Sequence, residues 1–190
     1  MPLFCLPYIY LANYPIFTPT LVPQTWLDHV IPFQPAWIWV YQSVYLLTGT
    51  LPLLATTREQ LRRYLIGFAL LTGACFLIYI FFPTQIHRHM PEESPSIMFD
   101  FLWLYDGDCN ALPSLHVGFL YFTLVFARRV YGPAPLWAWL LFSTWFLLIA
   151  YSTLATKEHL ALDLYAGLAL AFVCDKLTWS RLFNRRELAV

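Results

Sequence analysis

Two segments of the chain carry the side chains best suited to chemistry. The first runs from Asn110 to His116 and the second from Thr156 to Asp163. In the second, His159 and Asp163 are four residues apart, a spacing that puts two side chains on one face of a helix. A carboxylate that accepts a hydrogen bond from one imidazole nitrogen makes the other nitrogen a better electron donor. The pair therefore predicts a nucleophilic His159 that is oriented by Asp163. The alternative is that the two side chains only hydrogen-bond each other inside a helix interface and have no catalytic role.

The first segment is predicted to begin a helix at Pro113 and Ser114. Free amide groups and the dipole at a helix start attract phosphate. His116, about one turn further along, could protonate a leaving oxygen. Ser114 either donates a hydrogen bond to the phosphate or only caps its helix. A Pro-Ser-x-His string alone is a weak signal, but together with the His159 and Asp163 pair it predicts phosphoryl transfer.

Phosphoryl transfer also requires positive charge around the phosphate oxygens. Arg88 and Lys157 are the cations predicted in the loops beside the two segments, so we expect them, with Ser114, to bind phosphate. For both cations the alternative is ordinary anchoring at the membrane interface. The four cysteines have no metal-binding spacing, and we expect neither a metal nor a cofactor. A formal net charge of zero gives no reason to expect a nucleic-acid partner.

The composition indicates that lipid surrounds the elements that position these residues. Apolar residues make up 59% of the chain and charged residues 12%, against roughly one quarter charged residues in a soluble domain. Five long apolar stretches, which contain no charged residue except Asp163, each approach the roughly 20 residues that cross a bilayer: 35–55, 64–82, 112–127, 133–155 and 160–174. We therefore predict an all-α, polytopic membrane helical bundle with five spans.

The chain is expected to form a single integral membrane domain over residues 1–190. An apolar, proline-containing segment over 1–30 either lies at the membrane interface or makes a sixth span. A catalytic helical core is predicted over 31–178, followed by a cytoplasmic tail over 179–190.

Basic residues near the ends of the spans predict the orientation. They gather after the first span, after the third and at the carboxyl end, and basic clusters of this kind favour the cytoplasmic side: Arg58, Arg62, Arg63, Arg128, Arg129, Lys176, Arg181, Arg185 and Arg186. The loops that carry the candidate site, 83–111 and the short one around 156–159, would then face the other side. We expect an integral protein of a bacterial inner membrane whose active site faces the periplasmic or extracytoplasmic side.

These motifs resemble those of the type 2 phosphatidic acid phosphatase superfamily, from about Trp26 to Cys174. The family's Pro-Ser-Gly-His is matched by residues 113–116 with leucine in place of glycine. Its Ser-Arg followed by His and Asp is matched by Ser152, His159 and Asp163, and Arg88 is the best counterpart of the arginine in its third motif.

Two departures from the family pattern concern the phosphate charge. Thr153 stands in place of the second motif's arginine, and no lysine precedes Arg88 at the family spacing. Lys157 is the candidate replacement. The Leu-Pro-Ser-Leu-His sequence, with Phe-Pro-Thr ahead of Arg88, looks most like the branch of inositol phosphorylceramide synthases and their bacterial relatives.

The resemblance and the residues together predict a metal-independent lipid phosphatase or phosphotransferase that forms a phosphohistidine. The partners would be a lipid phosphate and an acceptor, which is water or the hydroxyl of a second lipid or polyol. Transfer of a whole phosphoheadgroup, as in the synthase branch, is the alternative. Two alternatives of other classes are a non-enzymatic haem-binding membrane protein, with His116 and His159 as axial ligands, and a small transporter.

Overall fold

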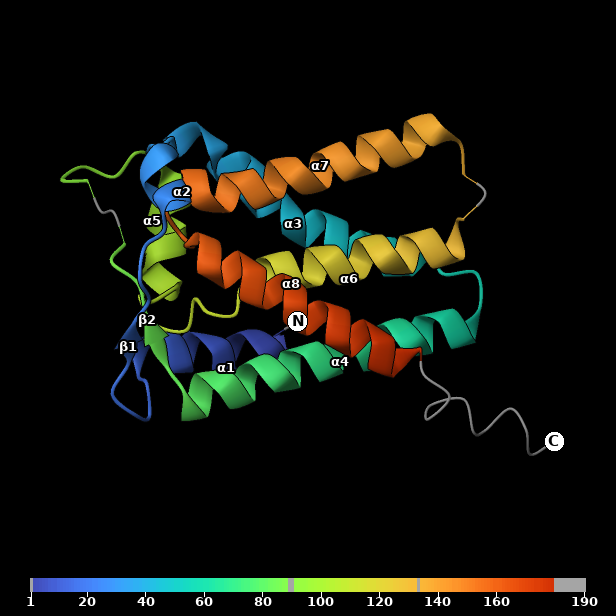
Figure 1. Ribbon diagram of the computed structural model, residues 1–190, viewed down its shortest axis with the longest axis horizontal. Helices are drawn as coiled ribbons and strands as arrows, with labels where there is room; N and C mark the ends of the chain where they lie inside the picture. The colour runs from blue at the N-terminus through green and yellow to red at the C-terminus, as the bar shows by residue number, and fades with distance from the viewer. Residues whose placement is uncertain (1, 89–90, 133, 180–190) are drawn as a thin grey trace.

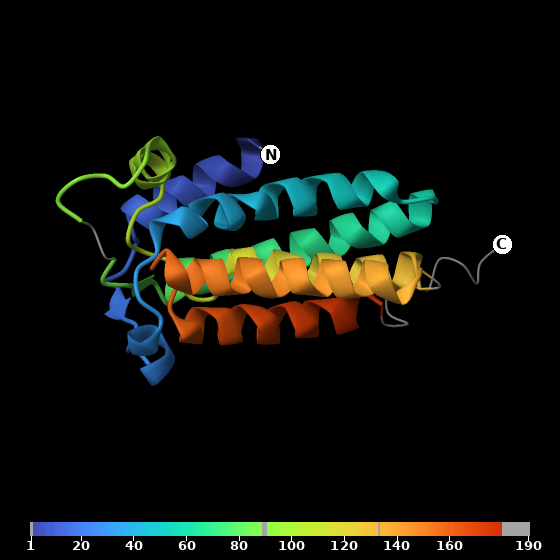
Figure 2. The same ribbon diagram turned by 90° about the horizontal axis from the view of Figure 1, so that it is seen from above.

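The computed structural model describes residues 2–88, 91–132 and 134–179. Figures 1 and 2 show the long helices running side by side along the longest axis of the molecule. These helices are α3 (Ile38–Thr50), α4 (Arg58–Phe81), α6 (Leu115–Val130), α7 (Leu136–Ala155) and α8 (Ala161–Thr178). α6 packs against the other four and most extensively against α8. The core of the bundle therefore forms around α6.

Shorter elements gather mainly at one end of the bundle, on the left in Figure 1. They are α1 (Pro2–Asn13), β1 (Thr20–Leu21), α2 (Trp26–Val30), β2 (Thr84–Gln85) and α5 (Ile97–Tyr105), while single 3-10 turns, η1 (Pro35–Trp37) and η2 (Leu51–Leu54), flank α3. β1 and β2 pair in parallel, with Thr20 opposite Thr84. Much of the predicted outer loop 83–111 is thus ordered structure that covers one end of the helices.

Local signals account for where the helices begin. Thr57 precedes α4 and accepts a hydrogen bond from the amide of Gln60, whose side chain bonds back to the Thr57 amide. Ser114 caps α6 in a similar way by accepting from the amide of Val117. Such caps satisfy amides that have no partner inside the helix.

The all-α prediction is confirmed apart from the two short strands. Each of the five stretches expected to span the membrane overlaps one of the long helices, although α4 begins before its stretch and α6 and α8 end beyond theirs. By length and composition only α4 and α7 qualify among the described residues as helices able to cross a bilayer. The count of five spans therefore stays a prediction. α1 has 12 residues, which is short of the roughly 20 needed for a span.

Arg63 and Arg129, from two of the basic clusters, meet at the end of α8, which lies at the end of the bundle opposite α5. Arg63 donates to the carbonyl of Thr178, with 3.4 Å between the atoms. Arg63 and Arg129 both lie over the Trp179 ring, 4.9 and 4.8 Å from its centre, and Arg129 also pairs with Asp175. The clusters that predicted a common side are therefore on one end. Most of the predicted tail, residues 180–190, lies outside the described residues.

Candidate active site

A direct contact between the starts of α6 and α8 brings the two histidine segments together. The amide of Ser114 donates to the carbonyl of Asp163 over 2.9 Å. Gly167 lies against the same turn, and a methyl group there would overlap the carbonyl oxygen of Ser114. The close approach of the two helices thus depends on a residue without a side chain at this position.

His159 precedes α8, which begins at Ala161, so the predicted pairing on one helical face is wrong. Asp163 lies in the first turn and its Oδ2 accepts from the amide of Leu160 over 2.8 Å. The chain therefore folds back at the helix start, and this places His159 Nδ1 3.5 Å from Asp163 Oδ2. His159 and Asp163 do meet, but through the capping of α8 rather than through helical periodicity.

The other nitrogen of His159 faces the start of α6. Its Nε2 lies 3.2 Å from the hydroxyl oxygen of Ser114, while that oxygen accepts from the Val117 amide over 3.4 Å. Ser114 thus caps α6 and contacts the candidate nucleophile at once. With Nδ1 directed to Asp163, Nε2 is the nitrogen that can act on a substrate.

His116 is the second residue of α6 and is held by an aromatic ring. It stacks on Tyr41 from α3, with 4.3 Å between ring centres and 22° between planes. The Tyr41 hydroxyl lies 3.5 Å from His116 Nδ1, and Nε2 has no hydrogen-bond partner among the described residues. The ring centres of His116 and His159 are 5.6 Å apart. A reacting group could therefore contact both.

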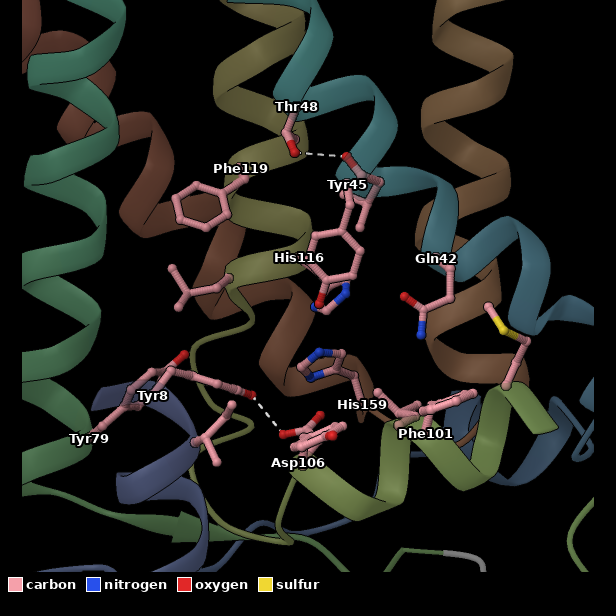
Figure 3. Close-up of a pocket in the computed structure, with 16 residues that line it drawn as sticks. Tyr8, Gln42, Tyr45, Thr48, Tyr79, Phe101, Asp106, His116, Phe119 and His159 are labelled. Atoms are coloured by element: carbon pink, nitrogen blue, oxygen red, sulfur yellow. Dashed lines mark hydrogen bonds between the residues drawn. The ribbon is translucent and has the colours of Figure 1, made fainter. Parts of the chain in front are cut away.

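Both histidines line a cavity of about 370 Å³, shown in Figure 3. Its wall also contains aromatic rings, apolar side chains and one carboxylate: Tyr8, Ile9, Gln42, Val44, Tyr45, Thr48, Tyr79, Met98, Phe101, Leu102, Tyr105, Asp106, Leu115 and Phe119. None of the described residues along this wall is an arginine or a lysine. The volume falls within the range that suits a small molecule or part of a lipid.

Arg88, predicted to bind phosphate, lies behind the cavity wall among carboxylates. Its guanidinium donates to the carbonyls of Asp106 and Gly107, over 2.6 and 3.2 Å. Nη2 lies 3.0 Å from Glu158 Oε2, and the side chain is 4% exposed. Burial disfavours its charge, but the nearby carboxylates outweigh burial and raise the pKa of Arg88. Arg88 thus anchors the loop that carries Asp106.

Lys157, the other predicted cation, points away from the histidines. Its ammonium group donates to the carbonyl oxygens of Asp28 and Ile31 at the end of α2. Burial lowers the pKa of Lys157. Thr153 stands where the related family has an arginine, and its hydroxyl donates a hydrogen bond to the carbonyl of Ala150. Lys157 therefore does not supply the charge that the missing arginine would give.

Sequence reasoning missed Glu158, Asp106 and Tyr41 as parts of the site. Glu158 directly precedes His159 and accepts from Trp103 Nε1 over 2.9 Å. Burial raises the pKa of Glu158 to about 7, although the Arg88 guanidinium opposes the shift. Burial likewise raises the pKa of Asp106 against the effect of Arg88. Adjacency to His159 was a usable signal for Glu158, whereas nothing local marks Tyr41.

Comparison with known proteins agrees with these motifs. The family model described as PAP2 superfamily matches residues 15–175, which include both histidine segments and most of the bundle. Neither the comparison with curated proteins nor that with solved structures finds a match. Since the family model covers well over half of the sequence, the chain belongs to the PAP2 superfamily.

Proposed function

We propose that the protein is an integral membrane enzyme that cleaves or transfers a lipid-linked phosphate through a phosphohistidine at His159. One observation carries the proposal: His116 in the first turn of α6 and His159 just before α8 line the same cavity, with 5.6 Å between their ring centres. Membership of the PAP2 superfamily supports phosphatase-type activity on phosphate esters.

In the first step, His159 Nε2 attacks phosphorus, and the bond from phosphorus to the leaving oxygen breaks. His116 Nε2 gives its proton to that oxygen. Asp163, 3.5 Å from Nδ1 of His159, stabilises the positive charge that develops on the ring. In the second step, water or another hydroxyl attacks phosphorus and passes its proton to His116, and the phosphorus–nitrogen bond breaks.

The dipole and free amides at the start of α6 favour the phosphate in this mechanism. Ser114, already 3.2 Å from His159 Nε2, can turn its hydroxyl to a phosphate oxygen. Arg88 lies behind the wall, where the carboxyl groups of Asp106, Asp108 and Glu158 offset its positive charge. We therefore assign the phosphate site mainly to the first turn of α6.

A lipid environment is supported by the apolar surface of the long helices. On α7, Trp137, Leu141 and Leu147 are each more than 60% exposed, and exposed apolar patches of this kind mark a membrane or partner surface. With the basic residues cytoplasmic, the site would lie at the opposite, extracytoplasmic end.

The test is phosphate release from lipid phosphates, with and without a polyol or lipid hydroxyl acceptor, for the wild type and His159→Ala. We expect His159→Ala to lose at least about 1,000-fold in rate, and acid-labile phosphate to be trapped on the wild type only. His87→Ala, which changes an exposed histidine in the loop, is the matched control and should keep wild-type rates. Equal rates for the wild type and His159→Ala would refute the proposal.

A further inference from the structure

The end of the cavity beyond His159 carries negative rather than positive charge. Asp106 lines the wall there, and it shares Arg88 with Asp108 and Glu158, at 3.7, 3.8 and 3.0 Å respectively. One guanidinium therefore faces three carboxyl groups. An anionic headgroup would be repelled at this end, while a cation would be attracted.

Aromatic rings border the same carboxylate. Tyr8 from α1 donates its hydroxyl to Asp106 Oδ1 over 3.1 Å, and Phe101 and Tyr105 from α5 also line the cavity. Figure 3 shows Asp106 on the side of His159 away from His116, with Tyr8 to the left and Phe101 to the right. Ring faces beside a carboxylate attract alkylammonium groups by the cation–π interaction.

The opposite end of the cavity differs in character. Figure 3 places Thr48 and Phe119 beyond His116, on the side away from Asp106, and Val44 and Leu115 add further apolar surface to the wall. The histidines therefore lie between an apolar end and an acidic, aromatic end. A lipid tail fits the first and a polar cationic group fits the second.

We propose that the cavity binds the alkylammonium group of a zwitterionic phosphodiester lipid at Asp106, between Tyr8, Phe101 and Tyr105. This rests on the proposed function and names its substrate class: a phospholipid with an amino-alcohol headgroup, with the phosphate at the two histidines and the acyl chains toward Phe119. A bound cation also favours the ionised form of Asp106, which burial disfavours.

This orientation decides which phosphate ester bond breaks. His116 lies on the apolar side of His159 in Figure 3, so in this orientation it would contact the oxygen of the lipid alcohol. His159 Nε2 bonds to phosphorus, the bond to the lipid alcohol oxygen breaks, and that oxygen takes the His116 proton. The headgroup phosphate stays on His159 until water or an acceptor hydroxyl attacks, gives its proton to His116 and breaks the phosphorus–nitrogen bond.

The experiment compares dihexanoyl phosphatidylcholine with dihexanoyl phosphatidylglycerol, two lipids that differ only in the headgroup. We measure release of dihexanoylglycerol and expect KM for the choline lipid to be about tenfold lower. Asp106→Asn should raise that KM about tenfold and leave KM for the glycerol lipid unchanged. Asp100→Asn makes the same change at an exposed site on α5 and should keep both wild-type values.

Two further measurements separate folding and catalysis from binding. Phe101→Leu removes a ring without touching Asp106 and should reduce the headgroup preference even if Asp106→Asn does not fold. In His159→Ala, which cannot turn over, the choline lipid should raise Tm more than the glycerol lipid does. If His159-dependent activity shows no headgroup preference, the headgroup proposal is overturned and the function stands. If neither lipid reacts but the Asp106-dependent Tm shift persists, the function fails and the binding site stands.

Discussion

The two ends of the helical bundle differ in whether their buried polar groups have hydrogen-bond partners. At the end opposite α5, Arg129 and Asp175 satisfy each other through paired hydrogen bonds. At the other end, His116 lines the cavity, and its Nε2 is buried and has no hydrogen-bond partner among the described residues. Folded proteins rarely leave such atoms unpaired. We infer that the paired groups at the first end stabilise the fold and that the unpaired group at the second end is available to bind a ligand.

The largest effect should come from His116, because it is the proposed proton donor and acceptor. His116→Ala should lower the rate about 100- to 10,000-fold and change Tm little. Activity assays and thermal unfolding on the same preparations check this. His29→Ala, a change at an exposed histidine of α2, is the control. An inactive His116→Ala protein that also fails to fold would break the contrast between the two ends.

At the basic end the expected pattern is reversed. Arg129→Ala leaves Asp175, which is 2% exposed, without its partner and should reduce the free energy of unfolding by about 3 kcal/mol. The activity of the folded fraction should stay unchanged. Adding Asp175→Ala removes the unpaired charge, so the double variant should recover much of the loss. Loss of activity without loss of stability would show that this end takes part in the reaction.

Gly167 links the site to the packing of the bundle. Gly167→Ala should push Ser114 away from α8 and lower the rate about 100-fold, since a shift of about 1 Å in a reacting group has that effect. The matched control is Gly73→Ala in α4, where a methyl group meets no atom within 4 Å, so stability should rise slightly. Equal rates for both variants would mean that α6 and α8 do not need this contact.

The smallest effect concerns pH. The pKa of Glu158 is raised to about 7 from 4.5. Between these two pH values the folded protein keeps the Glu158 proton, whereas the unfolded chain has released it. The contribution of Glu158 to stability is therefore full below about pH 4.5 and falls as pH rises to about 7. Over this pH range the Tm of Glu158→Gln should fall by about 5 °C less than the Tm of the wild type. Parallel curves for the two proteins would show that Glu158 does not titrate there.

The helices, the two segments that carry chemistry and the family could all be predicted from the sequence. Hydropathy, proline positions and caps such as Thr57 and Ser114 act between neighbours along the chain, so they can be read without a structure. The match over residues 15–175 confirms the family. The roles of His116, His159 and Asp163 stay predictions, although the three residues do come together.

The arrangement of charges and rings around these residues could not be predicted and follows from the packing of the helices. Arg88 and Lys157 were equivalent as loop cations, but the fold directs one to carboxylates and the other to the carbonyls of α2. Asp106 and Tyr8, separated by 98 residues, meet at the cavity because α1 and α5 lie at the same end. Burial and electrostatic partners depend on contacts between distant parts of the chain, and local sequence patterns do not encode which ones form.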